Sequence, residues 1–438
     1  MPSLKSYPLI GSSLALMRHK DFDRERIYKV FLSFFRDYGK IFKVNFPGQP
    51  PLVFISKPED IEHLHRATTN NPVRQFFFSL KHVRDNNPYF ENNSGLLTEN
   101  HEKWRRVRSR VQTPLLRPKN LLKYLPEMDQ TSKDFLEIIA SYQRRLGEMP
   151  EHFLNDLNKW ALESVALVAL NTRLGCLKSD LPEDSMQVQM INNADKMLKA
   201  MRVTELGLPL WKIFATPSYK KLKYSHDAFL SFADENIRKA EKDLMVKKSS
   251  NNEAEMTLME TLLNTEGLTR KDVVTMILDM LFGGIDTTSH TVAFTLYLLA
   301  KNPDKQKKLQ LEIDEVLGDG KQTLSENHLA RLSYLKCCVK EALRIYPYIG
   351  TGRELEKDEV FSGFLVLKGI LFRTFNLATT MNEENFQTRQ KSSFQKDGRE
   401  TLPLDQSILM PLSLFLMDRE CASEEGSQNK KFTHSWQE

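Results

Sequence analysis

Two adjacent glycines, Gly283 and Gly284, stand almost directly before an acid and a hydroxyl, Asp286 and Thr287. They lie inside a long apolar stretch that predicts a buried helix, where each glycine costs roughly 1 kcal/mol relative to alanine. A helix accepts this cost where another group must approach its backbone closely, and the acid and hydroxyl can then relay protons to a ligand bound there. The alternative is a helix kink in which threonine side chains bond back to the preceding turn.

Two further pairs of side chains have helical spacing. Glu341 and Arg344 are three residues apart, so they share one helix face and can pair. An isolated pair of this kind is usually a solvated surface bridge that contributes little to stability. Trp104 and Arg108 also share a face, and both can donate hydrogen bonds to a carboxylate. When this second pair is taken alone, a core tryptophan beside solvated arginines is the favoured interpretation.

The segments that must position these side chains are mainly helical. A long helix over 269–301 begins with Thr269 and Asp272, which resemble a capping box, and stops before Asn302 and Pro303. Its middle is nearly all apolar, so we expect it to be buried on all sides. We therefore predict one large, mainly α domain with a small β component. The other expected helices cover 22–39, 56–68, 100–115, 128–147, 151–172, 184–204, 218–248, 253–264 and 326–346, and short strands are expected at 40–45, 51–55 and 359–375.

Composition and charge exclude several classes of protein. The 438 residues carry 62 Lys and Arg against 57 Asp and Glu, and a net charge of +5 is too small for a nucleic-acid-binding protein. The four cysteines form no CxxC pair, which argues against a disulfide framework or a zinc site. No apolar run reaches the length of a membrane span, and the N-terminus does not resemble a targeting segment. The cysteines are Cys176, Cys337, Cys338 and Cys421.

Taken together, the three motifs stand in the order and separation of the cytochrome P-450 family, which the chain resembles from near its start to about Phe386. The resemblance implies the fold of that family over residues 1–386 and a heme-thiolate monooxygenase. Such an enzyme would insert one atom of O2 into a lipophilic substrate such as a sterol. The substrate itself is not identified by these motifs.

The resemblance also assigns expected roles to the motif residues. Asp286 and Thr287 would deliver protons on the distal side of the heme, where the helix backbone at the paired glycines lies close to the cofactor. Glu341 and Arg344 would form a structural pair beneath the heme. The residues expected to contact the heme, including its propionates, are Gly283, Gly284, Trp104, Arg108 and Arg353.

Finer features resemble the mitochondrial class of this family. The stretches 171–176 and 208–217 are similar to segments typical of that class, and Lys336 and Lys340 match lysines with which it docks an acidic, adrenodoxin-type ferredoxin. A solvated helix face is the alternative for the two lysines. The class implies a mitochondrial, inner-membrane-associated protein, and the apolar segment 206–214 is a candidate for peripheral membrane contact, with a packed helix junction as the alternative.

The resemblance breaks in the tail, 387–438. Oxygen activation needs a cysteine thiolate on the heme iron, which the family presents in a glycine-containing loop. Cys421 lacks those glycines, so we expect it to be a thiol in an irregular tail and not a metal ligand. The chain as written should then bind heme weakly or not at all.

A shift of the reading frame accounts for the missing loop. When the third base of each codon is joined to the first two bases of the next, Met417 followed by Asp418 can encode only glycine. The next pairs permit proline, arginine, methionine, cysteine, isoleucine and glycine in turn, which is the family loop. We infer a shift that begins near Asn385 and Phe386. The rival hypothesis is an inactive, heme-free remnant of the family that acts at most as a ligand- or partner-binding protein.

Overall fold

Helices dominate the chain and strands are few, as the sequence predicts. The computed structural model describes residues 1–385 except 24–25, 48–49, 70, 76, 92, 179–180, 250–255, 319–321, 348–349 and 383–384. The tail 387–438, with Cys421 and the inferred frame shift, lies outside the described residues. Within them, the chain forms two units, and we describe each by itself.

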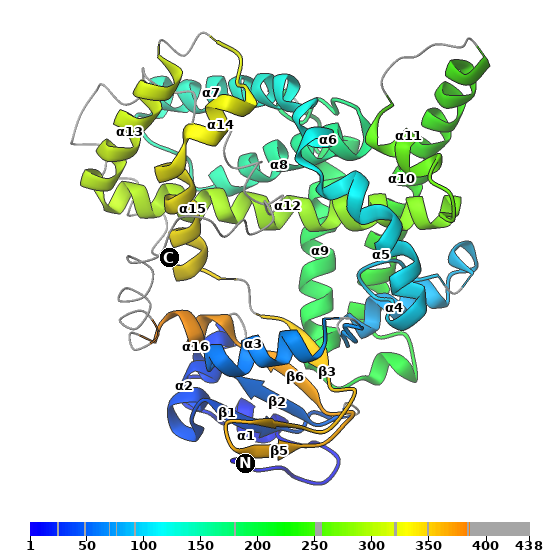
Figure 1. Cartoon of the computed structure of the whole chain (residues 1–438), viewed down its shortest axis with the longest axis vertical. Helices are drawn as coiled ribbons and strands as arrows, with labels where there is room; N and C mark the ends of the chain where they lie inside the picture. Colours follow the sequence, from blue (N-terminus) through cyan, green and yellow to red (C-terminus); the bar gives the residue numbers. More distant parts are fainter. Residues whose placement is uncertain are drawn as a thin grey trace. The chain divides into compact units, whose positions relative to one another are not determined.

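The first unit is built around a four-stranded sheet whose strands come from both ends of the chain. It comprises Met1–Arg106, Met197–Tyr224 and the chain from Leu343 onward. The strand order is β1-β2-β6-β3, and the parallel pairing of β2 with β6 joins segments far apart in sequence. Figure 1 shows these strands side by side, blue beside orange. The strands are β1 (Ile41–Val44), β2 (Leu52–Ile55), β3 (Gly352–Glu354) and β6 (Leu371–Thr374), with a separate hairpin of β4 (Glu359–Phe361) and β5 (Phe364–Val366).

Each face of this sheet has its own apolar core, because successive strand residues point to opposite sides. Leu52 and Phe54 pack with the phenylalanines of α2 on one face. Val53 and Ile55 pack with Phe361 of β4 on the other. The sheet is therefore buried on both sides, which fits its run of apolar residues. The helices wholly within this unit are α1 (Ser13–Met17), α2 (Tyr28–Tyr38), α3 (Pro58–Ala67), α4 (Phe78–Asp85), η1 (Pro88–Phe90), η2 (Leu210–Lys212) and α16 (Asn376–Thr380).

The second unit is helical and is organised around α12 (Arg270–Lys301). It comprises Val107–Lys196 and Ser225–Ala342 among the described residues. Helix α12 packs along α8 (Phe153–Leu170), whose last eleven residues, from Trp160 to Leu170, are all buried. The expected capping box at Thr269 and Asp272 is present. The other helices wholly within this unit are α6 (Pro118–Leu122), α7 (Leu125–Leu146), α11 (Leu258–Leu263), α13 (Pro303–Leu317) and α14 (Glu326–Arg331).

Four helices contain a boundary between the units and continue through it. They carry several of the residues that the sequence analysis selects, so their bounds matter for the site. They are α5 (His101–Leu116), α9 (Met186–Leu206), α10 (Pro217–Ser249) and α15 (Ser333–Ile345).

Three local predictions differ from the structure. The single helix expected over 326–346 is divided at the fully buried Leu332 into α14 and α15. The sequence predicts that the long helix ends before Pro303. This residue also stands in the first turn of a new helix, α13, where the missing N–H of proline is tolerated. The strand expected over 359–375 is three strands, because Ser362 and Gly363 both have positive φ, 45° and 81°, and form a tight hairpin turn.

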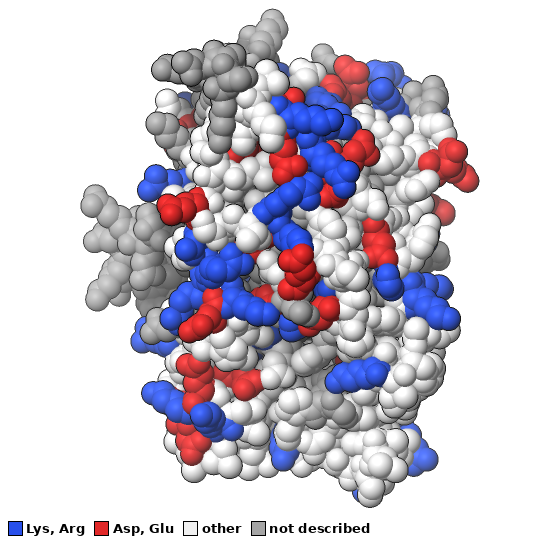
Figure 2. All heavy atoms as spheres, turned by 90° about the vertical axis from the view of Figure 1, so that its right-hand side faces the viewer, with Lys and Arg blue, Asp and Glu red and all other residues white. Residues whose placement is uncertain are grey.

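None of the described helices combines the length and the apolar character needed to cross a membrane. Figure 2 shows one face on which basic and acidic side chains are interspersed and large areas are uncharged.

Candidate functional site

The two glycines of α12 have different surroundings. A Cβ atom at Gly284 would lie 2.7 Å from Cγ2 of Val165 on α8, so this glycine permits the close packing of the two helices. A Cβ atom at Gly283 would meet no atom within 4 Å among the described residues. Of the pair, Gly283 therefore has the open side against which another group can lie, and Gly284 is explained by helix packing.

Asp286, one turn after Gly283, is half-buried. Its Oδ2 atom is buried and has no hydrogen-bond partner among the described residues. Burial raises the pKa of this carboxyl, nearby His290 lowers it, and Asp195 on α9 raises it further. The net result is a pKa above the ordinary value, so the group retains its proton at a higher pH than an exposed aspartate does. That is the property required of a proton donor.

Thr287 and Thr291 bond back along α12. The Thr287 hydroxyl donates to the carbonyl of Gly283 at 2.6 Å, and the Thr291 hydroxyl donates to the carbonyl of Thr287 at the same distance. This is the bonding that the kink interpretation expects. It does not exclude a proton-relay role, because a hydroxyl that donates one bond can still accept another.

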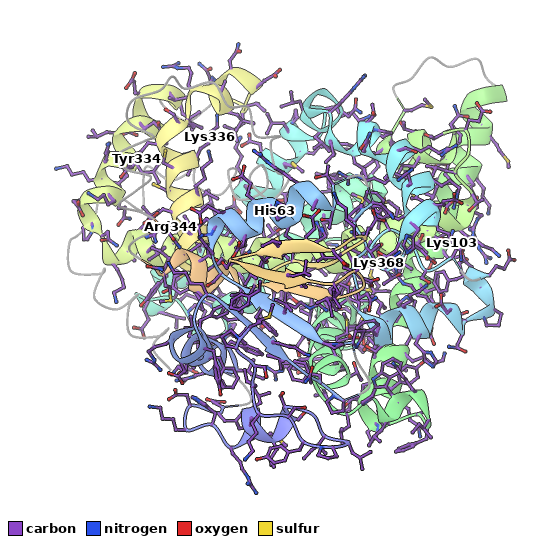
Figure 3. All side chains as sticks on the ribbon, turned by 60° about the horizontal axis from the view of Figure 1, so that its bottom comes forward. His63, Lys103, Tyr334, Lys336, Arg344 and Lys368 are labelled. Carbon is purple, nitrogen blue, oxygen red and sulfur yellow. The ribbon has the colours of Figure 1, made fainter. Side chains whose placement is uncertain are left out.

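Helix α15 carries four of the selected residues. Lys336 is half-buried and donates to the carbonyl of Ala330 at 3.2 Å, whereas Lys340 and Glu341 are exposed. Arg344, near the end of the helix, donates to the carbonyl of Thr380 at 3.2 Å and so connects α15 to α16. Figure 3 shows Lys336 and Arg344 at different levels of this helix.

Trp104 and Arg108 lie in α5 and are both half-buried. The guanidinium of Arg74 lies over the Trp104 ring, 5.3 Å from its centre, in a cation–π contact. Arg74 is held by Asn100, whose side chain accepts from the Arg74 backbone N–H at 2.8 Å. The sequence analysis missed Arg74, because it precedes the motif by thirty residues in the chain and no local spacing connects the two.

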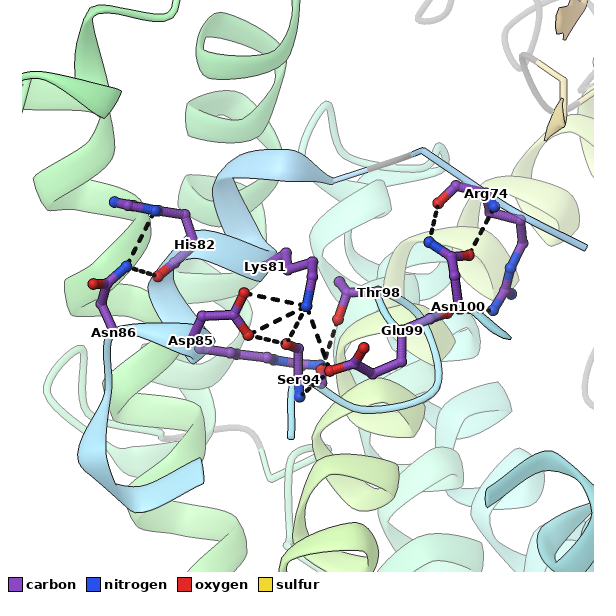
Figure 4. A network of polar contacts seen from close by, with 10 residues as sticks. Arg74, Lys81, His82, Asp85, Asn86, Ser94, Thr98, Glu99 and Asn100 are labelled. Carbon is purple, nitrogen blue, oxygen red and sulfur yellow. Dashed lines mark hydrogen bonds and ion pairs between the residues drawn. The ribbon is translucent and has the colours of Figure 1, made fainter. Parts of the chain in front are cut away.

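A polar network fixes the chain between α4 and α5, immediately before Trp104. Lys81 donates to Ser94 at 2.9 Å and forms ion pairs with Asp85 at 3.1 Å and with Glu99 at 3.4 Å. The Ser94 hydroxyl donates to Asp85, and its backbone N–H donates to Glu99 at 3.0 Å. Figure 4 shows these groups together with the Arg74–Asn100 contact. The start of α5 is therefore held by charge-assisted bonds as well as by apolar packing.

Arg353 lies on β3 and is half-buried. Burial lowers the pKa of Arg353. The pKa of His65 on α3 is also lowered, mainly by burial and secondly by the positive charge of Arg353. The neighbouring strand β6 carries Arg373, whose pKa burial lowers to about 10. Arg353 pairs with Phe372 in the sheet register, so Arg353 and Arg373 point to opposite faces. The sequence motif predicted a role for Arg353 and did not point to Arg373.

These surroundings can be compared with the needs of a heme. A desolvated cation such as Arg353 gains from a bound anion, so it fits a propionate group, and the open side of Gly283 fits a flat ring. Trp104 and Arg108 retain N–H donors on a partly exposed helix. Taken separately, these residues fit the edges and one face of the cofactor.

Two of the three described cysteines, Cys176 and Cys338, have thiols with a raised pKa. Cys176 is buried, and burial together with the carboxylate of Glu163 raises the pKa of its thiol. Burial raises the pKa of Cys338 to about 11. Both thiols are therefore protonated at neutral pH when no metal is bound. The part of the chain that the structure describes also holds no cluster of three His, Cys, Asp or Glu side chains suited to a metal ion.

The apolar segment that follows α9 is divided between buried and exposed residues. Trp211 is buried, and its indole N–H donates to the carbonyl of Thr204 at 2.9 Å. Ile213 and Phe214 are 82% and 56% exposed. The segment is therefore packed at Trp211 and exposed at Ile213 and Phe214.

The cytochrome P450 family model matches residues 1–391. In Drosophila melanogaster, "Probable cytochrome P450 49a1" is 34% identical over 84% of this chain and 64% of its own length. "Probable cytochrome P450 301a1, mitochondrial" is 32% identical over 89% of this chain and 71% of its own length. "Cytochrome P450 302a1, mitochondrial", from the same species, is 30% identical over 83% and 72%. The chain thus spans about two thirds of the length of these relatives.

The match covers the described residues and all the motifs from Trp104 to Arg353. Several of the relatives are named mitochondrial, which agrees with the class that the finer sequence features resemble. Heme is the cofactor that this match implies, as predicted. The chain therefore belongs to the cytochrome P450 family, in its mitochondrial class.

Proposed function

We propose that the protein is a heme-dependent monooxygenase that inserts one atom of O2 into a lipophilic substrate. The observation that carries this proposal is the carboxyl of Asp286 on α12, beside the open side of Gly283, with its Oδ2 atom buried and its pKa raised. A proton source placed against the cofactor face is what oxygen chemistry at that face requires. Asp286 and Thr287 would hold and transfer the proton there. Sterols are one substrate class compatible with such a site.

Residues from several elements would hold the heme. Arg353, together with Trp104 and Arg108, would bind its propionates, and Gly283 would admit the ring close to the α12 backbone. Gly284, Glu341 and Arg344 would support the surrounding helices. When bound, the heme supplies the iron at which O2 is activated. The side chains then contribute orientation, exclusion of water and protons.

We further propose that the thiolate ligand is missing from the chain as written, through the frame shift near Phe386. The carbon monoxide difference spectrum, recorded on the reduced full chain expressed with heme, tests function and lesion together. We expect no band of thiolate-ligated heme from the chain as written, and the full band once the frame is corrected. A band from the uncorrected chain would disprove the lesion. Its absence from the corrected chain would disprove the monooxygenase and favour the remnant.

We propose that electrons come from an acidic ferredoxin that docks at Lys336 and Lys340. Lys336 and Lys340 lie one turn apart on α15, and near the start of this helix the amino group of Lys308 lies 4.4 Å from the centre of the Tyr334 ring. Local positive charge steers and orients an acidic partner. Figure 3 marks the position of Lys336 and Tyr334.

Neutralising the two lysines, Lys336→Gln with Lys340→Gln, should weaken ferredoxin binding to the frame-corrected protein by about tenfold or more at low salt, because two attractive charges are lost. Titration of the heme spectrum with ferredoxin measures the affinity. Lys239→Gln on α10, which removes an exposed charge paired with Glu235 at 2.8 Å, is the matched control. Equal losses in both proteins would place the docking surface elsewhere.

We also propose peripheral contact with the mitochondrial inner membrane through Ile213 and Phe214. Their exposure supports this, since a bilayer surface can bury such side chains. Flotation with liposomes, compared between the wild type and Ile213→Glu, tests it. Unchanged flotation would disprove contact through this segment.

A further inference from the structure

Residues 71–75 form a short strap that bonds both to the start of α5 and to strand β3. The side-chain amide nitrogen of Asn71 lies 3.1 Å from Nδ1 of His101, the first residue of α5, and also donates to Glu356, two residues after β3. A side-chain NH2 group carries two hydrogens, so one nitrogen can serve two partners. The strap, both partners and Trp104 all belong to the first unit.

The rest of the strap alternates between the two elements. The carbonyl of Val73 accepts from the backbone N–H of Glu354 on β3 at 2.9 Å, and the side chain of Gln75 donates to the Glu354 carboxylate. Arg74, between them, bonds toward α5. Successive side chains of an extended chain point to opposite sides, which is why Arg74 and Gln75 reach different elements. Since β3 stands at the end of the strand order, the strap bonds to its outer edge.

Asn100, immediately before α5, connects the strap to Trp104. Its amide oxygen accepts from the backbone N–H of Arg74 at 2.8 Å, and its amide nitrogen donates to the Arg74 carbonyl at 3.2 Å (Figure 4). The backbone carbonyl of Asn100 accepts from the N–H of Trp104 at 3.3 Å. The Arg74 guanidinium, which lies over the Trp104 ring, donates to the carbonyls of Leu96 at 2.8 Å and Glu99 at 3.4 Å.

We propose that Asn100 is a positioning residue that, through the strap, fixes the separation of Trp104 from Arg353. These two residues would bind the heme propionates from α5 and from β3, where Arg353 directly precedes Glu354. Hydrogen bonds weaken steeply once donor and acceptor leave their narrow range of distance and angle. Donors on two elements therefore serve one cofactor only if the spacing of those elements is fixed. The inference rests on the proposed function for the heme, but the connection itself is tested without heme.

Amide hydrogen exchange of the chain as written tests the connection. In Asn100→Ala, the N–H of Glu354 should exchange about fivefold faster or more, because a strap without its bonds to Asn100 opens from β3 more often. The amides of α8, in the second unit, should keep their rates. Asn100→Asp retains the acceptor for the Arg74 N–H but loses the donor for its carbonyl, so it should give a smaller increase.

Asn86→Ala is the matched control. It removes a comparable amide bond in the first unit, from Asn86 to the carbonyl of His82 at 2.8 Å, and should leave the exchange of Glu354 unchanged. An unchanged Glu354 rate in Asn100→Ala, or an equal acceleration in α8, would overturn the connection.

Heme with blocked propionates tests what the connection serves. The frame-corrected Asn100→Ala protein should lose heme to an excess of apomyoglobin about tenfold faster than the wild type. It should lose heme dimethyl ester at nearly the wild-type rate, because the methyl esters carry no charge for Trp104 and Arg353 to bind. Equal acceleration for both would show general loosening and overturn the positioning role. A corrected chain without the thiolate band would instead overturn the monooxygenase and leave the exchange result standing.

Discussion

Asp286→Asn should lower turnover of the frame-corrected protein by about 10²- to 10⁴-fold, the usual contribution of a positioned general acid. Asparagine has nearly the same shape but cannot give up a proton from a carboxyl group. Heme content and the thiolate band should stay unchanged, because the residue is proposed to act on protons and not on heme binding. Product formation per reducing equivalent, measured at saturating ferredoxin, checks this.

The pH dependence of turnover tests whether the protonated form of Asp286 is the active one. Burial raises the pKa of Asp286, so the wild type should lose activity as pH rises through that raised value and the proton is lost. The pH–activity profile of Asp286→Asn should lack this descending limb. Asp304→Asn, which changes an exposed acid on α13, should retain both the limb and full turnover. A limb that persists in Asp286→Asn would assign the titration to another group.

The same group also makes stability depend on pH. Because the pKa of Asp286 is higher in the folded than in the unfolded chain, the folded state binds more protons between the two values. Its contribution to stability is therefore greatest below the unfolded value and is lost as pH rises through the raised value. Asp286→Asn removes this loss, so it should melt at a higher temperature than the wild type at neutral pH while being less active.

Gly284→Ala should destabilise the protein by about 1–3 kcal/mol, the usual effect of overpacking a core. Its new Cβ atom would approach Cγ2 of Val165 to 2.7 Å, and α8 is buried on all sides there. The effect should exceed the gain of roughly 1 kcal/mol in helix propensity that alanine brings. Denaturant unfolding of the full chain measures the difference.

Gly283→Ala is the matched control on the same helix. It meets no atom within 4 Å among the described residues, so it should be neutral or stabilising by up to about 1 kcal/mol. It should nevertheless lower heme occupancy in the frame-corrected protein, because it fills the open side. Val165→Ala should restore stability to Gly284→Ala. If the two glycine variants unfold alike, the packing argument is wrong.

Much of the fold was accessible from sequence because helices follow local rules. The apolar period predicted most of the helices, and the capping box at Thr269 was confirmed. The motif order alone was sufficient to predict the family, which the match over residues 1–391 confirmed. The helix after Pro303 was missed because proline is compatible with both the end and the start of a helix.

The sequence by itself determined which residue types are available for chemistry: an acid and a hydroxyl after paired glycines, an arginine late in the chain, and a tail without the cysteine loop. Only the tertiary structure decided that Gly283 is open while Gly284 packs on Val165, and that Arg74 covers Trp104. It also decided that the Oδ2 atom of Asp286 is buried and has no hydrogen-bond partner among the described residues. Steric contact and desolvation depend on groups distant in the chain, so no local pattern contains them.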